Sequence, residues 1–183
     1  MAWTSPKTWV NDEPLTAADL NAQLSGNIAF LSQLMNSYTL LRDEKSTLSY
    51  GGTFTGGGWR TRALNTKYGD AQGNVTLGGN QFTLVPGTYY IRAQAPAAEV
   101  DQHKLNLHNM TDNVSMMVGS NAYASSTNAG QSTATLQAFF TITGTKTFEL
   151  QHYCLTTCAT YGFGQRVAWG IEIYAVVEIW RVK

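Results

Sequence analysis

The sequence predicts an all-β sandwich preceded by a short α-helix, and three observations support this fold class. Charged residues make up only 13% of the 183 residues, about half the usual share. Seventeen glycines and many small polar residues separate short segments in which apolar residues alternate, as expected of strands joined by turns. Only one stretch near the N-terminus has a helical period instead. About eight strands of this length indicate a two-sheet sandwich of the jelly-roll type.

The predicted helix begins at Thr16, a suitable N-cap residue that is followed three positions later by Asp19. Its apolar residues form one stripe with spacings of mostly three or four: Leu20, Leu24, Ile28, Leu31, Leu34 and Met35. No charged residue lies between Asp19 and Arg42, and a lone helix of this kind is marginal in water. We therefore expect Leu24, Ile28 and Leu31 to pack against copies of the helix or against a neighbouring protein. A second interpretation is open, in which the helix folds onto its own β domain.

A stretch rich in Gly, Ser and Thr separates the helix from the strands and predicts a domain boundary. Three parts follow from it. Residues 1–45 form a helical N-terminal segment that associates with other chains, residues 46–58 form a linker, and residues 59–183 form the head domain. Within the head, strands are expected at 59–64, 75–77, 82–84, 88–95, 103–108, 114–118, 133–143 and 146–153, with a polar loop over 121–132.

The last thirteen residues, 171–183, are the most informative strand. The odd positions form one apolar face that belongs in a core: Ile171, Ile173, Ala175, Val177 and Ile179. The even positions are apolar at four of six places, Tyr174, Val176, Trp180 and Val182, which is too many for a face left in water. We expect these four side chains to contact sister subunits of an oligomer. A central strand covered on both sides within one chain is the alternative.

The leader resembles the opening of many phage structural proteins, in which a string of aromatic-Val-x-x-Glu-x-Leu-Thr-Ala-x-Asp-Leu-Asn precedes a short helix. The matching residues are Trp9, Val10, Glu13, Leu15, Thr16, Ala17, Asp19, Leu20 and Asn21. This resemblance implies a virion protein that contacts other virion proteins through its N-terminal segment.

The body resembles the trimeric jelly-roll heads related to complement C1q and tumour necrosis factor, in the version found at the tips of phage fibres. The matching pieces lie in order at residues 82–84, 86–91, 139–142, 147–153, 162–164 and 178–182. The resemblance implies a homotrimer whose terminal strands lie near the three-fold axis. It also implies a protein that binds a partner and has no catalytic activity. The calcium positions of the family have no acidic match here.

His152, Cys154 and Cys158 are the candidate metal ligands, because histidine and thiolate suit zinc and a fourth ligand could come from His103 or His108. By alternation, however, His152 falls on the inward face of its strand. A hydrogen-bonded core histidine beside buried thiols is the commoner arrangement, so we expect no metal and no other cofactor. A disulfide would need a turn between the two cysteines, which residues 155–157 could make. Because we see no secretion signal, we expect both thiols to be free.

No set of residues predicts catalysis. The chain has no phosphate-binding glycine loop followed by a helix. Glu172 and Glu178 are about 20 Å apart in an extended strand, farther than the two carboxylates of a glycosidase. Asp101, Asp112 and Asn113 have no EF-hand spacing, and we interpret them as turn formers.

Three aromatic residues, Tyr123, Tyr161 and Phe163, lie in loops rich in Gly, Ser and Asn. Such loops resemble binding surfaces, in which rings supply contact area and small polar residues supply hydrogen bonds. We therefore predict that these three residues bind a ligand. The alternative is that the rings close the end of the sandwich.

These observations predict a non-enzymatic phage protein, located in the virion and assembled in the host cytoplasm, whose trimeric head binds a host surface glycan or protein. The zero net charge argues against nucleic-acid binding, and no apolar run is long enough to insert into a membrane. No signal peptide is expected. Two alternatives are open. One is a capsid-decorating fibre or adaptor with a structural role, and the other is a soluble C1q-like lectin.

Overall fold

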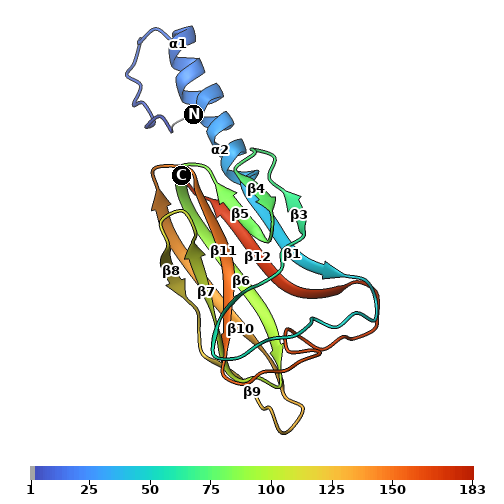
Figure 1. Cartoon of the computed structure of the whole chain (residues 1–183). Helices are drawn as coiled ribbons and strands as arrows, with labels where there is room; N and C mark the ends of the chain where they lie inside the picture. Colours follow the sequence, from blue (N-terminus) through green and yellow to red (C-terminus); the bar gives the residue numbers. More distant parts are fainter. Residues whose placement is uncertain (1–2) are drawn as a thin grey trace.

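The computed structural model describes residues 3–183, apart from the side chains of Leu34 and Met35. A helical extension projects from one end of a β sandwich (Figure 1). The extension consists of α1 (Ala17–Leu20), the π-helical turn η1 (Asn21–Gly26) and α2 (Asn27–Met35). The strands are β1 (Tyr38–Lys45), β2 (Gly58–Thr61), β3 (Thr66–Gly69), β4 (Val75–Gly78), β5 (Gln81–Leu84), β6 (Gly87–Ala98), β7 (Asp101–Asn109), β8 (Val114–Val118), β9 (Ala122–Ala124), β10 (Gln131–Ile142), β11 (Lys146–Cys154) and β12 (Glu172–Arg181).

The strands form two antiparallel sheets in a jelly-roll arrangement, as predicted. One sheet has five strands in the order β10-β6-β12-β1-β3. The other has seven, with β4-β5-β11-β7-β8 as its main path, while β2 pairs with β11 and β9 pairs with β7. From β5 to β12 the chain crosses repeatedly between the sheets, and strands distant in sequence become neighbours. This connectivity places β12 at the centre of the five-stranded sheet, between β6 and β1.

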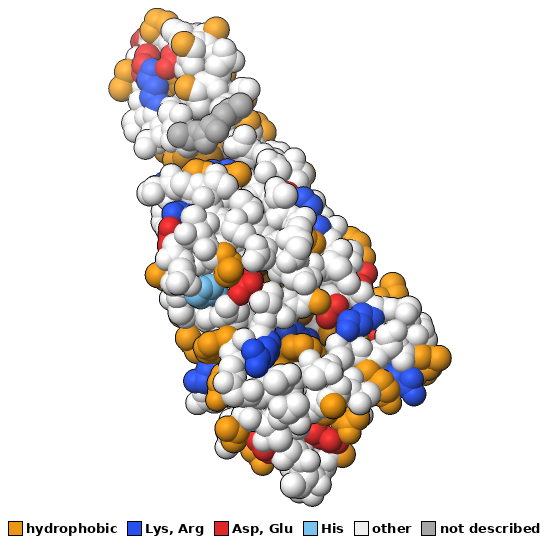
Figure 2. Space-filling view, viewed as in Figure 1, with side chains coloured by type: hydrophobic (Ala, Val, Ile, Leu, Met, Phe, Trp, Pro, Cys, Tyr) orange, Lys and Arg blue, Asp and Glu red, His pale blue; other side chains and the backbone are white. Residues whose placement is uncertain are grey.

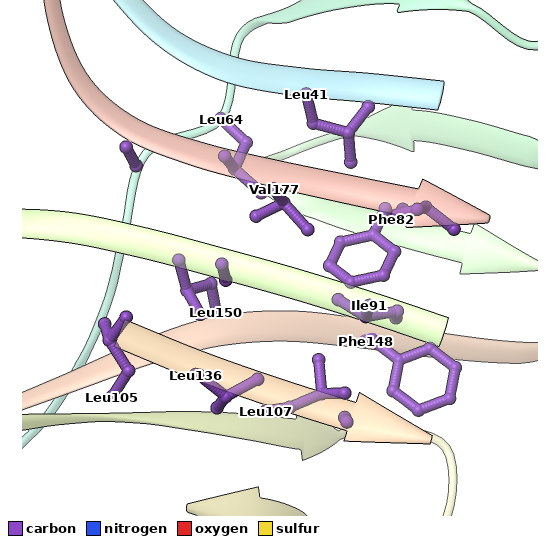
Figure 3. Close-up of a cluster of buried hydrophobic side chains, with 14 of the residues drawn as sticks. Leu41, Leu64, Phe82, Ile91, Leu105, Leu107, Leu136, Phe148, Leu150 and Val177 are labelled. Carbon is purple, nitrogen blue, oxygen red and sulfur yellow. The ribbon is translucent and has the colours of Figure 1, made fainter. Parts of the chain in front are cut away.

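The inner faces of both sheets form one apolar core. Leu136 and Ile91 from one sheet lie near Leu107 and Phe148 from the other (Figure 3), and the rings of Phe82 and Phe148 stack with centroids 5.8 Å apart. The predicted alternation is confirmed in β6, β7, β10 and β11, whose apolar sets are buried. These sets are Tyr89, Ile91, Ala93 and Ala95; Leu105 and Leu107; Ala134, Leu136, Ala138 and Ile142; and Phe148 and Leu150.

The helix begins where the sequence predicts. Thr16 is the N-cap, and its Oγ1 accepts a hydrogen bond of 3.1 Å from the Asp19 backbone N–H. The helical rod then leads away from the sandwich (Figure 1). The interpretation in which it folds onto its own β domain is wrong, because Leu24 and Ile28 remain 57% and 58% exposed. The side chains of Leu34 and Met35 lie outside the described residues.

The predicted domain boundaries need a correction. Residues 38–45, assigned to the helical segment, form β1, which pairs with both β12 and β3 inside the five-stranded sheet. The expected linker 46–58 belongs to the head as well, because Phe54 is fully buried and bridges Cys158. The head therefore begins at residue 38. The sequence did not predict β1, because its charged residues are unusual for a strand that is hydrogen-bonded to a neighbour on each edge.

The predicted single inward face of β12 is wrong at its start. Ile171 and Ile173 are 63% and 41% exposed, whereas Tyr174 is only 2% exposed. The register with β1 shifts between Asp43 and Glu44, which leaves Tyr174 as an extra residue. This β-bulge turns both Tyr174 and Ala175 inward and reverses the alternation that precedes them.

Other differences are smaller. The strand predicted over 59–64 ends at Thr61, β3 was not expected, and β9 lies within the predicted polar loop. The predicted turn between β4 and β5 is present, with Gly79 and Asn80 both at positive φ. Within the described residues, no helix is sufficiently long and apolar to cross a membrane.

Candidate functional site

The leader folds back along one face of the helix. The side-chain amide of Asn27 bonds both backbone groups of Thr4, at 2.9 and 3.0 Å. Gln23 accepts from the Lys7 N–H at 3.0 Å and donates to the Ser5 carbonyl at 3.1 Å. Lys7 Nζ lies within 4 Å of two carboxylates, and charged side chains of both signs lie near the tip of this extension (Figure 2). The leader is therefore held by paired amides along its length.

The apolar stripe of the helix lies about 100° further round, one residue on from the amide positions, and is uncovered. Its members are Leu20, Leu24, Ile28 and Leu31, which are 44%, 57%, 58% and 46% exposed. Four large apolar side chains on one face of an isolated helix provide a ready surface for self-association. This exposed face contains Leu24, Ile28 and Leu31, the three residues that we expected to pack against copies of the helix or against a neighbouring protein.

A row of four aromatic rings crosses the outer face of the five-stranded sheet. Tyr38 of β1 and Tyr90 of β6 both pair with Trp180 of β12, and Phe139 of β10 pairs with Tyr90. The Trp180 ring lies 5.1 Å from that of Tyr38 and 5.5 Å from that of Tyr90. Phe139 is 65% exposed. Cross-strand aromatic pairs stabilise a sheet, but a row of four facing water calls for a covering partner.

The charged groups next to this row are already paired. The Tyr38 hydroxyl donates to Glu178 Oε1 at 3.2 Å, and Arg92 Nε lies 3.9 Å from Glu178 Oε2. Burial, followed by the nearby Glu178, raises the pKa of Tyr38. Since Glu178 has a partner at each oxygen, this face can be covered without leaving its carboxylate unpaired.

The loop before β12 adds exposed apolar side chains beside the same sheet. Val167, Trp169 and Ile171 are 78%, 90% and 63% exposed. Glu172 fixes the loop by accepting from the N–H groups of Val167 and Ala168, at 2.9 and 2.7 Å. These backbone bonds lower the pKa of Glu172, that of Val167 most strongly. A groove of about 720 Å³ lies between the loop and the sheet face.

Of the four predicted interface residues in and after β12, three face outward and one is buried in its own chain. Val176, Trp180 and Val182 are half-buried or exposed on the outer side of the sheet. Tyr174 is a correction: it is buried within its own chain, and its hydroxyl donates to the Ser49 carbonyl at 2.6 Å. The bulge described above is the reason, since it rotates Tyr174 into the sandwich.

The three loop aromatics do not form one exposed surface. Tyr123 is 59% exposed. Phe163 stacks on Phe54 with centroids 4.4 Å apart and lies under the guanidinium of Arg62, 4.2 Å from its ring. Phe163 thus closes the end of the sandwich, as the alternative interpretation held. Tyr161 is half-buried beside a polar pocket.

The candidate metal ligands are engaged within the core. His103 Nδ1 lies 2.9 Å from His152 Nε2, and His103 Nε2 lies 2.8 Å from Ser132 Oγ. Cys154 and Cys158 are both free and buried, and burial raises the pKa of Cys154 to about 12. Across residues 3–183 no group of three or more His, Cys, Asp or Glu side chains is placed to hold a metal ion.

The residues interpreted as turn formers, Asp101, Asp112 and Asn113, are hydrogen-bonded within their own chain. Asp101 accepts from Ser126 and Thr156 side chains, at 2.9 and 2.5 Å. Asp112 pairs with Lys146 at 2.6 Å, while Asn113 Oδ1 accepts from His108 Nε2 at 3.2 Å. These contacts stabilise loops, consistent with the interpretation as turn formers.

Sequence analysis missed Arg62, which is only 1% exposed. Its guanidinium donates to the carbonyls of Phe163 and Tyr174, and its pKa is lowered to about 9 by burial. The alternation of a strand could have indicated its burial, because Arg62 lies two residues before the buried Leu64 and therefore on the same face. A buried cation thus joins β12 to the loop at the far end of the sandwich.

The sheet order and the two uncovered apolar surfaces define a jelly-roll head carried on a helical extension. Among solved structures, the globular domain of zebrafish complement 1qA protein is 21% identical, with 80% of this chain and 96% of that chain covered and a TM-score of 0.48. Murine APRIL at pH 5.0 is 8% identical, with 79% and 98% covered and a TM-score of 0.48. Eiger TNF from S. frugiperda is 9% identical, with 80% and 92% covered and a TM-score of 0.47.

These values describe a likeness in overall fold, and the fold class itself rests on the sheet topology described above. No family model and no curated protein matches the chain.

Proposed function

We propose that the protein is a non-enzymatic phage virion protein, a homotrimer whose jelly-roll heads bind a host surface glycan or protein. The observation that carries the proposal is the pair of uncovered apolar surfaces, one on the helix and one on the five-stranded sheet. They are close along the chain, because only residues 36 and 37 separate the end of α2 from Tyr38, at one end of the aromatic row. Three copies meeting along both surfaces would bury them together.

The leader supports the virion assignment. Trp9, Val10 and Leu15 match the opening of phage structural proteins and are 42%, 68% and 59% exposed. They lie on the extension, away from the loops at the other end of the sandwich (Figure 1). This arrangement leaves one end of the chain for another virion protein and the other end for the host.

A trimer also explains how such a head binds without a deep pocket. Three weak sites held at fixed separations can exceed the affinity of one site by about 10² or more. The binding function therefore depends on assembly.

The test compares adhesion of the intact protein with that of the double variant Leu24→Asp, Ile28→Asp, using fluorescently labelled protein and a panel of bacterial cells. We expect the intact protein to bind at least one strain, and the double variant to lose most of that binding together with its trimer mass. The variant Thr76→Val, on the exposed side of β4, is the control and keeps both properties. Absence of adhesion to every strain, with particles that lose stability when the protein is removed, would instead support a structural role.

A further inference from the structure

A small polar pocket lies at the end of the sandwich opposite the helical extension. It is formed where β6 ends and where the chain turns after β11, near β9 (Figure 1). Its volume is about 280 Å³, at the lower limit for small-molecule sites. The side chains that matter are Glu99, Ser126, Thr156, Thr157, Thr160 and Tyr161. Four hydroxyl-bearing threonine and serine residues and one carboxylate in so small a space make it unlike the two apolar surfaces.

The carboxylate is held in place with one oxygen available. Tyr161 donates its hydroxyl to Glu99 Oε2 at 2.9 Å, and that bond raises the pKa of Tyr161. No residue in the described chain bonds Glu99 Oε1. Glu99 itself has a φ of 55°, a strained conformation for a residue with a side chain, and such strain gathers at binding sites.

The hydroxyls offer both kinds of hydrogen bond. Thr157 Oγ1 accepts from the Gly56 N–H at 2.9 Å, so its own hydrogen is free to be donated. Thr156 and Ser126 donate to Asp101, which leaves their oxygen lone pairs as acceptors. Thr160 bonds no group among residues 3–183 and can serve in either way.

One wall of the pocket is aromatic and fixed. The ring of Tyr161 lies 5.6 Å from that of Tyr50, which is covered by Arg166 at 4.5 Å. Tyr161 lines the pocket, and this contact together with the Glu99 bond fixes its position. Aromatic area next to mixed donors and acceptors matches a ligand with an apolar C–H face and several hydroxyl groups.

We infer that this pocket binds one sugar unit of a neutral saccharide. A hydroxyl group both donates and accepts, which suits Thr157, Thr160 and Glu99 Oε1 together. The Glu99 carboxylate disfavours an anionic ligand. This inference rests on the proposed function and deepens it, because it assigns adhesion to a defined site and a ligand class.

The test is amide NMR of the isotope-labelled full chain, titrated separately with glucose, galactose, rhamnose and N-acetylglucosamine to about 50 mM, since one small site binds in the millimolar range. We expect at least one sugar to shift the amides of Thr157, Thr160 and Tyr161. Calcium and methylammonium are run alongside. If the sugars leave these amides unmoved, or if only a cation moves them, the saccharide assignment is wrong.

Two variants establish which groups bind. Glu99→Gln keeps an acceptor for Tyr161 but removes the charge, and we expect affinity for the sugar to fall roughly tenfold or more. Thr160→Val should weaken binding about three- to tenfold. Glu44→Gln is the matched control, because Glu44 also accepts from a tyrosine hydroxyl, that of Tyr68 at 3.1 Å, and its affinity stays unchanged. An equal loss in the control overturns the inference, whereas the mass of the protein in solution reports separately on the proposed trimer.

Discussion

The outer faces of the two sheets differ sharply in composition. On the five-stranded sheet, four aromatic rings cross four strands, from Tyr38 to Phe139. On the seven-stranded sheet, a chain of side-chain hydrogen bonds joins Ser115, Asn106, Gln151, Glu149 and Thr61, with lengths of 2.5 to 3.0 Å. The aromatic row is unusually apolar for a face left in water, whereas the polar groups of the second face bond one another. The comparison indicates which side of the sandwich requires a partner.

One aromatic pair interrupts the polar face. Trp59 and Tyr153 lie edge to face at 5.7 Å, with Trp59 39% exposed. A single pair is ordinary for a surface, whereas a continuous row together with an apolar loop is not. This pair provides the matched control for the experiments on the opposite face.

The largest expected effect separates a buried position in the core from an exposed position on the outer face of the five-stranded sheet. Phe148→Ala empties a fully buried position and should lower the free energy of unfolding by about 3–5 kcal/mol at any protein concentration. Phe139→Ala removes a ring that we expect to contact a sister copy, so its loss should grow with concentration. Urea unfolding at two concentrations measures both. If the free energy of unfolding lost in Phe139→Ala does not depend on protein concentration, this face does not take part in the assembly.

The second effect sets the pH range in which the faces can be compared. Burial, and then Arg62, lower the pKa of His103 to about 4 from 6.5. The pKa of His152 is also lowered, by burial, Arg62 and His103. Because the unfolded chain binds these protons more readily, the contribution of the neutral histidine pair to the free energy of unfolding is complete above pH 6.5. It is lost as pH falls towards 4, by up to about 3 kcal/mol for His103.

Urea unfolding at several pH values in this range should show that the free energy of unfolding falls with pH, and that it falls less steeply in the variant His152→Gln. His108→Gln is the control, because His108 lies on the surface beside Asn113. The same slope in the His152 variant and the parent protein would contradict a neutral buried pair.

The third effect tests the aromatic row directly. Trp180→Ser should weaken assembly by about 2 kcal/mol or more per subunit, as for a central interface residue. Trp59→Ser, on the polar face, should leave assembly unchanged. Sedimentation velocity measures the assembly of both variants and of the parent protein. Equal assembly of the two variants would contradict the assignment of the aromatic row to the interface.

The smallest effect concerns the loop that presents Trp169. The pKa of Glu172 is lowered chiefly by the Val167 N–H bond, so its stabilisation is present above the ordinary pKa of 4.5 and is lost as pH falls through the folded value. The protection factors of the Val167 and Ala168 amides, which correct for the slower intrinsic exchange in acid, should fall as Glu172 is protonated. Glu172→Gln should show faster exchange at pH 7 than the parent, while the core amides stay slow.

Much of the sandwich was predictable because its strands follow a strict period of two. In β10, Leu136 and Ala138 are buried while Thr135 and Gln137 are exposed, as alternation requires. The helix start was predictable for a similar reason, since the cap at Thr16 is local chemistry. Trp180 and Val176 could be assigned to the outer face from the same periodicity.

The failures arise where a partner strand decides the outcome. Tyr174 turns inward because β1 is one residue shorter across the bulge, and the sequence of β12 contains no mark of it. β1 itself carries the charged pair Asp43 and Glu44, of which Asp43 is buried near Arg62. A buried ion of this kind depends on tertiary contacts. The small polar pocket opposite the helical extension is formed by separate loops. For that reason, Tyr161 is the only one of its residues that the sequence predicted to bind a ligand.

The mass of the intact protein in solution, measured by light scattering at micromolar concentration, tests the central claim most directly. If sister chains cover the aromatic row and the helical stripe, the mass should be near three times the 20.0 kDa of one chain. A stable species near 20.0 kDa would mean that both surfaces tolerate water, and would contradict the account.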